Sequence, residues 1–212
     1  PGVTVERKVG RLRLADRRWI ELLDLPGTYS LAAHSPDEMI AADALLGQQA
    51  GAPPIDAVLA IVDASNLRRN LYLVSQLLEA GLPVVVALNM MDVAAARGTR
   101  IDAAALSARL GVPVVPVSAT RRQGLAELRA AVIGAALQPG GASPAETPFP
   151  PAMLQQIAEL QAWRPPGPDG EPRSMTRLEA VRALIDAGGH IEQRLAGVLG
   201  PSFLREVQDR RA

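Results

Sequence analysis

The sequence contains no cysteine, and Lys8 is the only lysine among its 212 residues. The absence of cysteine excludes a disulfide framework, a thiolate zinc site and an iron–sulfur cluster built by this chain alone. The formal net charge is zero, with 22 basic and 22 acidic residues. This balance argues against a nucleic-acid-binding arm and against a polybasic membrane patch. The two histidines, His34 and His190, lie too far apart in the sequence to form a local metal motif.

Long apolar runs are also absent. None approaches the roughly 20 residues that a membrane-spanning helix needs, and no signal peptide opens the chain, so we expect a soluble, cytoplasmic segment. Lys8 is followed by Val9, so the sequence has no phosphate-binding loop of the form Gly-x-x-x-x-Gly-Lys-Ser/Thr. The sequence begins at Pro1 rather than at a methionine. We therefore expect it to be the downstream part of a longer protein.

Apolar periodicity predicts an α/β arrangement over most of the chain. The first two predicted strands flank a turn and are expected to pair in antiparallel. The later strands are continuous apolar runs, which are typical of strands buried on both faces. Because these strands alternate with helices, the pattern indicates a parallel sheet with helices on both faces. The predicted strands are residues 5–14, 18–23, 57–62, 83–88 and 112–117, and the predicted helices are residues 36–49, 67–80, 102–110 and 124–137.

A Pro- and Gly-rich stretch at residues 138–151 has no periodicity and predicts a linker. Beyond it, the pattern indicates a small all-α domain. Its expected helices are residues 152–162, 175–187, 189–199 and 202–210. The predicted division is therefore an α/β domain over residues 1–137, the linker over 138–151 and a helical domain over 152–212.

The segment Asp24-Leu25-Pro26-Gly27 ends a predicted strand and enters a turn. In a GTPase, a strand that ends in Asp-x-x-Gly senses the γ-phosphate. The Asp reaches the Mg²⁺ shell, and the Gly offers a backbone N–H with no side chain in the way. The motif is weak alone, and it gains weight because two further elements follow at the ends of later strands.

The second element is Asn89-Met90-Met91-Asp92, directly after a predicted buried strand. In a guanine site, the Asp92 carboxylate would accept hydrogen bonds from the ring N1–H and the exocyclic amine. Adenine would leave that carboxylate unpaired, which is costly in a buried site. Asn89 would bond to the base edge and tie neighbouring loops together. In isolation, Asn-x-x-Asp also fits a helix cap, but its position after the strand favours the guanine site.

The third element is Ser118-Ala119-Thr120, which follows the next predicted strand. The small Ser-Ala pair would let a backbone N–H approach the guanine oxygen. Thr4 precedes the first strand, where a switch threonine would bind Mg²⁺ through its hydroxyl, although in isolation it fits an ordinary β-branched residue entering a strand. The segment from Asp63 to Asn66 favours a turn and helix cap, and His34 favours a solvated loop position.

Taken together, these stretches resemble the cytosolic GTPase part of bacterial ferrous iron transport protein B. The resemblance covers residues 1–137, whereas residues 150–212 match only in character, as the helical domain that links the GTPase domain to the membrane part. It implies a Ras-like P-loop GTPase fold whose first strand and phosphate loop are missing from this chain. The stretches that carry the resemblance are residues 2–8, 24–31, 62–73, 86–92 and 106–114.

The resemblance implies roles at the phosphate end of the site. Thr4 would be a Mg²⁺ ligand, Asp24 would hold Mg²⁺ through water, and Gly27 would contact the γ-phosphate. Thr28 stands where Ras-like enzymes keep a catalytic glutamine, so no general base is assigned. Potassium stimulation, which is common in this family, depends on a phosphate-loop asparagine that this chain lacks.

At the base end, the resemblance implies that Asn89 and Asp92 read guanine, while Ser118, Ala119 and Thr120 close over the base. Met90 stands where most small GTPases keep a lysine, as is usual in this family. The expected ligands are GTP or GDP, Mg²⁺ and, in the family, K⁺. The expected partner is the membrane domain of the same transporter, at the cytoplasmic face of the bacterial inner membrane. No nucleic-acid partner is expected, and a homo-oligomer stays open.

Three functions remain as alternatives. In the first, the intact protein hydrolyses GTP, but this chain binds it poorly. Losing about four charge-assisted hydrogen bonds of the phosphate loop would cost roughly 6 kcal/mol or more. The second is a non-enzymatic scaffold or regulator built on a degenerate GTPase domain. The third, another small bacterial GTPase, is weaker because such proteins usually carry lysine after the Asn and lack the Tyr-Ser-Leu of residues 29–31.

Overall fold

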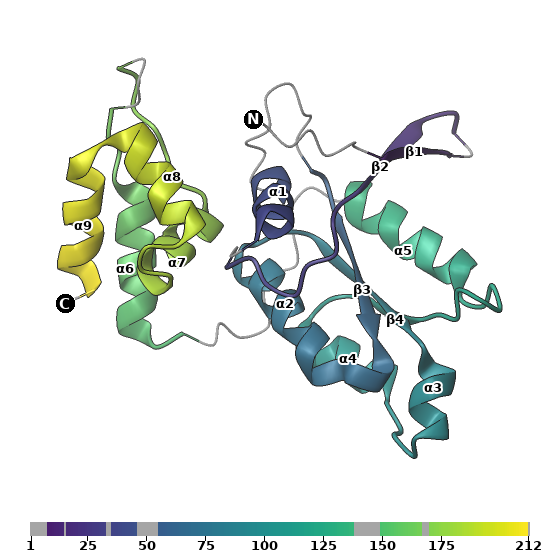
Figure 1. Cartoon of the computed structure of the whole chain (residues 1–212). Helices are drawn as coiled ribbons and strands as arrows, with labels where there is room; N and C mark the ends of the chain where they lie inside the picture. Colours follow the sequence, from purple (N-terminus) through teal and green to yellow (C-terminus); the bar gives the residue numbers. More distant parts are fainter. Residues whose placement is uncertain are drawn as a thin grey trace.

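The computed structural model describes residues 8–14, 16–32, 35–45, 55–137, 149–166 and 170–211. Figure 1 shows a strand-containing part beside a group of helices formed by the C-terminal residues. The strands are β1 (Lys8–Arg13), β2 (Trp19–Asp24), β3 (Val58–Asp63), β4 (Val84–Asn89) and β5 (Val114–Pro116). The helices are α1 (Pro36–Leu45), α2 (Leu67–Glu79), α3 (Met91–Ala96), α4 (Ala103–Leu110), α5 (Leu125–Leu137), α6 (Pro151–Ala162), α7 (Arg177–Ile185), α8 (His190–Leu199) and α9 (Pro201–Arg211), and a 3₁₀ turn, η1 (Ala64–Asn66), precedes α2.

The described strands form two separate sheets. β1 and β2 pair in antiparallel, with Lys8 opposite Asp24 and Arg13 opposite Trp19. β3, β4 and β5 form a parallel sheet in that order. Among the described residues, no strand ladder joins β2 to β3. The predicted antiparallel pair and the predicted parallel sheet are therefore both confirmed.

The central strand β4 is the most buried of the five. Its residues from Val84 to Leu88 are all buried, as the continuous apolar run predicts. The same prediction is wrong for β3 at Ile61, whose side chain is 69% exposed. The reason is that α2 packs against β3 and β4, whereas α5 packs against β4 and β5. Within the described residues, the face of β3 that carries Ile61 is therefore left open at this position.

One predicted strand is shorter in the structure, and one helix was missed. The strand expected over residues 112–117 is only Val114–Pro116, because proline has no N–H to donate to a ladder. Helix α3 was not predicted, although Asp92 in its first turn suits a helix start. Thr4, His34 and most of the predicted linker lie outside the described residues, so the domain boundary stays a prediction.

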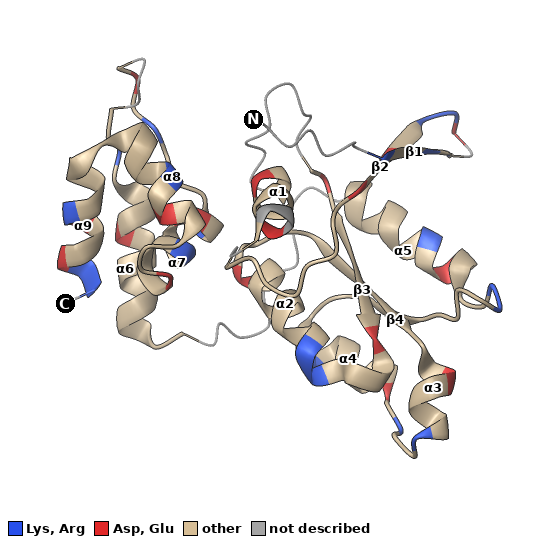
Figure 2. Cartoon of the chain, in the orientation of Figure 1, with Lys and Arg blue, Asp and Glu red and all other residues tan. Residues whose placement is uncertain are grey.

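All four helices expected at the C-terminal end are present as α6–α9. Helix α7 begins with a capping box: Thr176 accepts from the Glu179 backbone, and Glu179 accepts from the Thr176 backbone. Phe203 is fully buried and stacks on Trp163, with ring centroids 6.3 Å apart. Figure 2 shows acidic and basic positions interspersed on these helices. Ion pairs form here between Arg194 and Glu179, Arg210 and Glu159, and Arg211 and Glu192.

Contacts also join these helices to the strand-containing part. Arg177 donates to the backbone oxygen of Glu79 at the end of α2, and Arg182 donates to the Glu79 carboxylate at 3.0 Å. His190 of α8 lies 3.0 Å from the Asp43 carboxylate of α1. Burial raises the pKa of the Glu79 carboxyl, and the attraction of Arg182 offsets this only in part.

Candidate nucleotide site

Asn89 and Ala119 bring two loops together at one edge of the parallel sheet. Asn89 is the last residue of β4, and Ala119 lies shortly after β5. Because β4 and β5 are adjacent and parallel, their carboxyl ends meet at the same edge, where ligands bind in open α/β sheets. The Ala119 N–H donates to the Asn89 side-chain oxygen at 3.3 Å. This hydrogen bond holds the two loops side by side.

The residues after Asn89 turn the chain so that Asp92 lies beside the same loops. Met90 adopts the left-handed backbone conformation, with a φ of 61°, and α3 starts at the next residue. The Asp92 carboxylate is 41% exposed and lies 3.7 Å from the Arg121 guanidinium. An ion pair this exposed contributes only about 0–1 kcal/mol to the stability of the folded protein. The carboxylate is therefore open to a stronger hydrogen-bonding partner.

The loop at residues 118–124 is closed on itself. Ser118 and Gln123 exchange two backbone hydrogen bonds of 3.1 Å, and the hydroxyls of Ser118 and Thr120 lie 3.4 Å apart. Gly124 has a φ of +75°, and a Cβ there would lie 2.1 Å from the Pro116 oxygen. Only glycine fits at this position. The loop that carries Ala119 is thus fixed by its own backbone.

Asp24 and Gly27 lie at the end of β2, apart from these loops. Asp24 is exposed, and its side chain forms no hydrogen bond or ion pair within the described ranges. Leu25 and Pro26 are half-buried, and Leu25 packs against the core. A Cβ at Gly27 would meet nothing within 4 Å, so local packing does not explain this glycine. In the part of the chain that the structure describes, no hydrogen bond joins Asp24 or Gly27 to the cluster around Asn89.

The residues after Gly27 are held on α2 by side chains that belong to none of the predicted motifs. The Leu31 N–H donates to the Gln76 side-chain oxygen at 2.5 Å, and the Ser30 hydroxyl lies 3.3 Å from it. Leu31 is fully buried, and Gln76 is only 1% exposed. The Arg69 guanidinium lies over the Tyr29 ring at 3.7 Å. A glutamine among the apolar residues of α2 was the available signal for this anchor.

Smaller predictions can also be placed. Asp63 caps η1 by accepting from the Ser65 N–H at 2.8 Å, which confirms the predicted turn and cap. The Thr28 hydroxyl donates to the Ser30 backbone oxygen at 2.7 Å. Among the described residues, no three His, Cys, Asp or Glu side chains gather as a metal site. Nor does any helix within the described ranges have the length and apolar character that crossing a bilayer requires.

The family model described as ferrous iron transport protein B matches residues 1–132. The chain belongs to this family. It is 50% identical over 135 residues to the Fe(2+) transporter FeoB of Salmonella typhimurium, a match that covers 62% of this chain and 17% of that protein. The match to FeoB of Escherichia coli strain K12 has the same identity and coverage. The aligned part is therefore a small fraction of these relatives.

Solved structures extend the likeness over the whole chain. The cytosolic domain of the T. maritima FeoB iron transporter in its GMPPNP form has a TM-score of 0.73 at 29% identity, covering 100% of this chain and 82% of that one. NFeoB from S. thermophilus bound to mGMPPNP has a TM-score of 0.72 at 35% identity, covering 100% and 74%. The cytosolic domain of L. pneumophila FeoB has a TM-score of 0.71 at 33% identity, covering 99% and 84%. The predicted fold class, a Ras-like GTPase domain followed by helices, is confirmed.

Proposed function

We propose that this chain is the GTP-binding and GTP-hydrolysing regulatory part of a bacterial ferrous iron transporter. The observation that carries the proposal is the cluster of Asn89, Asp92 and Ala119 at the edge where β4 and β5 end. Family membership supports the transporter context, and nucleotide-bound FeoB structures support guanine nucleotide as the ligand.

At the base end, Asp92 accepts hydrogen bonds from the guanine N1–H and exocyclic amine. Its carboxylate has only a weak ion pair to lose, since Arg121 lies 3.7 Å away at an exposed position. The Ala119 N–H, which donates to Asn89 in this structure, is the donor that we assign to the guanine oxygen. Ser118 and Thr120 keep the loop closed over the base. Met90 directs the chain into α3, so its role here is in the backbone.

At the phosphate end, Asp24 and Thr4 are the proposed Mg²⁺ ligands, and Gly27 is the proposed γ-phosphate contact. The Asp24 carboxylate is exposed and has no side-chain partner among the described residues. It fits a hydrated Mg²⁺ ion, since hard cations prefer oxygen ligands. The open space at Gly27 fits the approach of a phosphate to its N–H. Bound Mg²⁺ would neutralise charge that develops on the phosphates. No potassium ligand is assigned, and no side chain is assigned as general base.

We further propose that the 212-residue chain alone binds GTP weakly. Its sequence has no phosphate-loop motif, and among the described residues β4 is the only strand that pairs with β3, the strand that carries exposed Ile61. The missing hydrogen bonds amount to roughly 6 kcal/mol or more, which is over about ten-thousandfold in affinity. Titrating fluorescent GTP into this chain and into a form extended upstream in its reading frame tests the proposal. Micromolar binding by the chain alone would refute it.

The guanine assignment has its own test in Asp92→Asn, made in the extended form. An asparagine amide donates where the carboxylate accepts, so it suits the C2 oxygen of xanthine and not the guanine amine. We expect GTP affinity to fall by at least about 100-fold while xanthosine triphosphate affinity rises. Asp56→Asn, at an exposed position outside the cluster, is the matched control. Unchanged GTP preference in Asp92→Asn would remove the basis of the assignment.

The membrane domain of the same transporter is the proposed partner of α6–α9, at the cytoplasmic face of the inner membrane. A non-enzymatic scaffold is the second candidate, favoured by the absent phosphate-loop motif. The genomic sequence upstream of Pro1 separates the two. An in-frame Gly-x-x-x-x-Gly-Lys-Ser/Thr supports the GTPase, and a start codon at the boundary supports the scaffold.

A further inference from the structure

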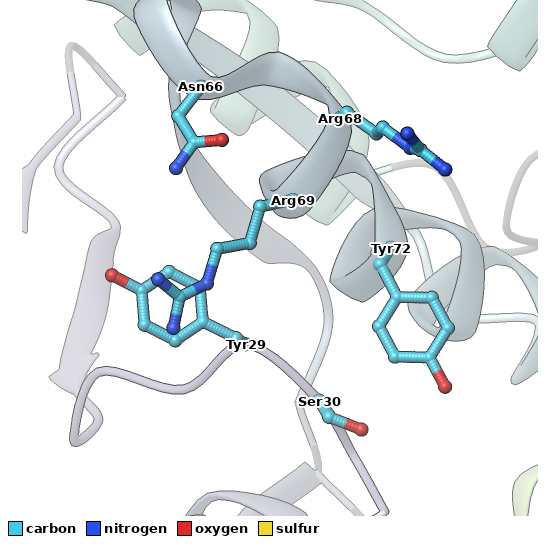
Figure 3. A pocket seen from close by; sticks show the side chains of 6 residues that line it. All are labelled: Tyr29, Ser30, Asn66, Arg68, Arg69 and Tyr72. Atoms are coloured by element: carbon cyan, nitrogen blue, oxygen red, sulfur yellow. The ribbon is translucent and has the colours of Figure 1, made fainter.

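A pocket outside the nucleotide cluster lies between the start of α2 and the loop that follows Gly27. Its volume is about 570 Å³, which is within the range of ligand-binding cavities. It shares no residue with the cluster around Asn89. Its lining residues are Tyr29, Ser30, Asn66, Arg68, Arg69 and Tyr72 (Figure 3).

The pocket is basic and aromatic. None of its lining residues is acidic, and no ion pair to Arg68 or Arg69 is formed within the described residues. The Arg69 guanidinium carbon lies over the Tyr29 ring, 3.7 Å from its centroid. This cation–π contact leaves guanidinium N–H groups free to donate. Tyr29 is 48% exposed and Tyr72 is 55% exposed. The pocket therefore offers uncompensated positive charge beside two accessible rings.

We propose that this pocket docks an acidic segment of a partner protein. Figure 3 shows Arg69 directed toward Tyr29, whereas Arg68 points away from Tyr29, toward the side on which Tyr72 lies. Two separated guanidinium groups suit an extended segment with spaced carboxylates better than one compact anion. Arginine and tyrosine are also the residue types that dominate binding energy at protein interfaces.

One wall of the pocket belongs to the proposed nucleotide-sensing loop. Tyr29 and Ser30 directly follow the segment that ends in Gly27, and Gln76 holds Ser30 and Leu31 on α2. If that loop leaves α2, Tyr29 leaves the pocket with it. Docking of the acidic segment is therefore tied to the conformation of the loop, and this dependence rests on the proposed function.

The test is selection of random peptides displayed on phage against the whole chain, followed by fluorescence anisotropy with a labelled copy of an enriched peptide. We expect enriched peptides to be rich in Asp and Glu. The double variant Arg68→Ala with Arg69→Ala should weaken binding by about tenfold or more, as expected for central interface arginines. Arg109→Ala, at an exposed position in the last turn of α4, should leave binding unchanged within about twofold. Tyr29→Ala should weaken binding more than Tyr29→Phe.

Each other outcome overturns the proposal. No enrichment, enriched peptides without acidic residues, or equal binding by the double variant all exclude an acidic segment at this pocket. Complete competition by inorganic phosphate alone indicates a small-anion site instead. A change in oligomeric state between wild type and the double variant, measured by sedimentation, indicates a second copy of this chain. Circular dichroism of each variant checks that it folds.

The same variants separate this proposal from the proposed function. Arg68→Ala with Arg69→Ala in the extended form should leave guanine selectivity unchanged, because neither residue lies in the Asn89 cluster. Asp92→Asn should change nucleotide choice and leave peptide binding to the nucleotide-free protein unchanged. If Asp92→Asn leaves nucleotide choice unchanged, the proposed function has failed. If the double variant leaves peptide binding unchanged, the docking proposal has failed.

Discussion

The helices α6–α9 and the strand-containing part differ in the surroundings of their carboxylates and large apolar side chains. In α6–α9, Glu179 is 1% exposed and its carboxylate pairs with Arg194 at 2.9 Å, while Phe203 has no exposed surface. In the strand-containing part, Asp24 is exposed and its side chain has no partner within the described ranges, and Ile61 is 69% exposed in the middle of a strand.

This difference separates stability from binding. Removing one partner of a buried ion pair in α6–α9 should destabilise these helices, because it leaves an uncompensated buried charge. Polar groups left open at the ends of β2 and β4 contribute little to folding and are available to a ligand. Natural proteins accept locally unfavourable arrangements mainly at functional sites. Four predictions test the comparison, and the two tryptophans, Trp19 on β2 and Trp163 after α6, report the two parts separately.

The largest expected effect is that of Phe203→Ala. It removes a fully buried ring from the stack on Trp163, which should lower the free energy of unfolding by about 3–5 kcal/mol. Urea unfolding followed by Trp163 fluorescence in a Trp19→Phe background measures it. Val9→Ala, at a 52% exposed position, is the control with an expected change under about 0.5 kcal/mol. An equally small change for Phe203→Ala would show that this core is not the main support of α6–α9.

The second prediction compares two large apolar residues of neighbouring strands. Leu88→Ala in β4 should cost about 2–5 kcal/mol, because Leu88 is fully buried. Ile61→Ala in β3 should cost under about 1 kcal/mol, since most of its side chain already meets solvent. Urea unfolding of both variants by circular dichroism gives the two values. Equal costs would contradict the uncovered face of β3. In the upstream-extended form, a larger cost at Ile61 would show that added residues cover it.

The third prediction concerns the capping box of α7. Thr176→Ala removes the oxygen that accepts from the Glu179 N–H and should cost about 1 kcal/mol. Thr176→Ser keeps that oxygen and should cost much less. Thermal unfolding followed by Trp163 fluorescence measures both. If serine and alanine destabilise α6–α9 equally, the hydroxyl is not the source of the stabilisation.

The smallest expected effect is a pH dependence at the contact between α2 and α7. Burial raises the pKa of the Glu79 carboxyl above its ordinary value of 4.5, so the folded state holds the proton more tightly than the unfolded state. This tighter binding of the proton stabilises the folded state. Its contribution is fully present below the ordinary pKa and is lost as pH rises through the raised pKa. The unfolding free energy of wild type relative to Glu79→Gln should therefore fall with rising pH.

The measurement is the urea midpoint of both proteins across the acidic to neutral range. Glu127→Gln, at an exposed position in the first turn of α5, should run parallel to wild type. If the unfolding free energy of wild type relative to Glu79→Gln rises with pH instead, the attraction between Glu79 and Arg182 outweighs the cost of burial.

Local patterns were sufficient for most of the elements. The apolar run of β4 predicted its extent to within one residue at each end and predicted its burial, and the C-terminal periodicity predicted α6–α9. Motif spacing brought Asn89, Asp92 and Ala119 forward as one group, and the structure places their loops side by side. Sequence reasoning missed α3, because its six residues are too short for a clear helical period. It also missed Gln76, since the partner of a buried side chain depends on residues some 45 positions away.

The amino-acid sequence by itself determined the family, the order of strands and helices, and which residues end the strands, because these depend on neighbouring residues along the chain. Only the tertiary structure decided that Ile61 is exposed while Val62 is buried, that Gln76 holds Leu31, and that Arg69 covers Tyr29. Burial and pairing of this kind depend on which element packs against which face. The packing of one element on another brings together segments that are distant in the sequence, so a local sequence pattern does not predict it.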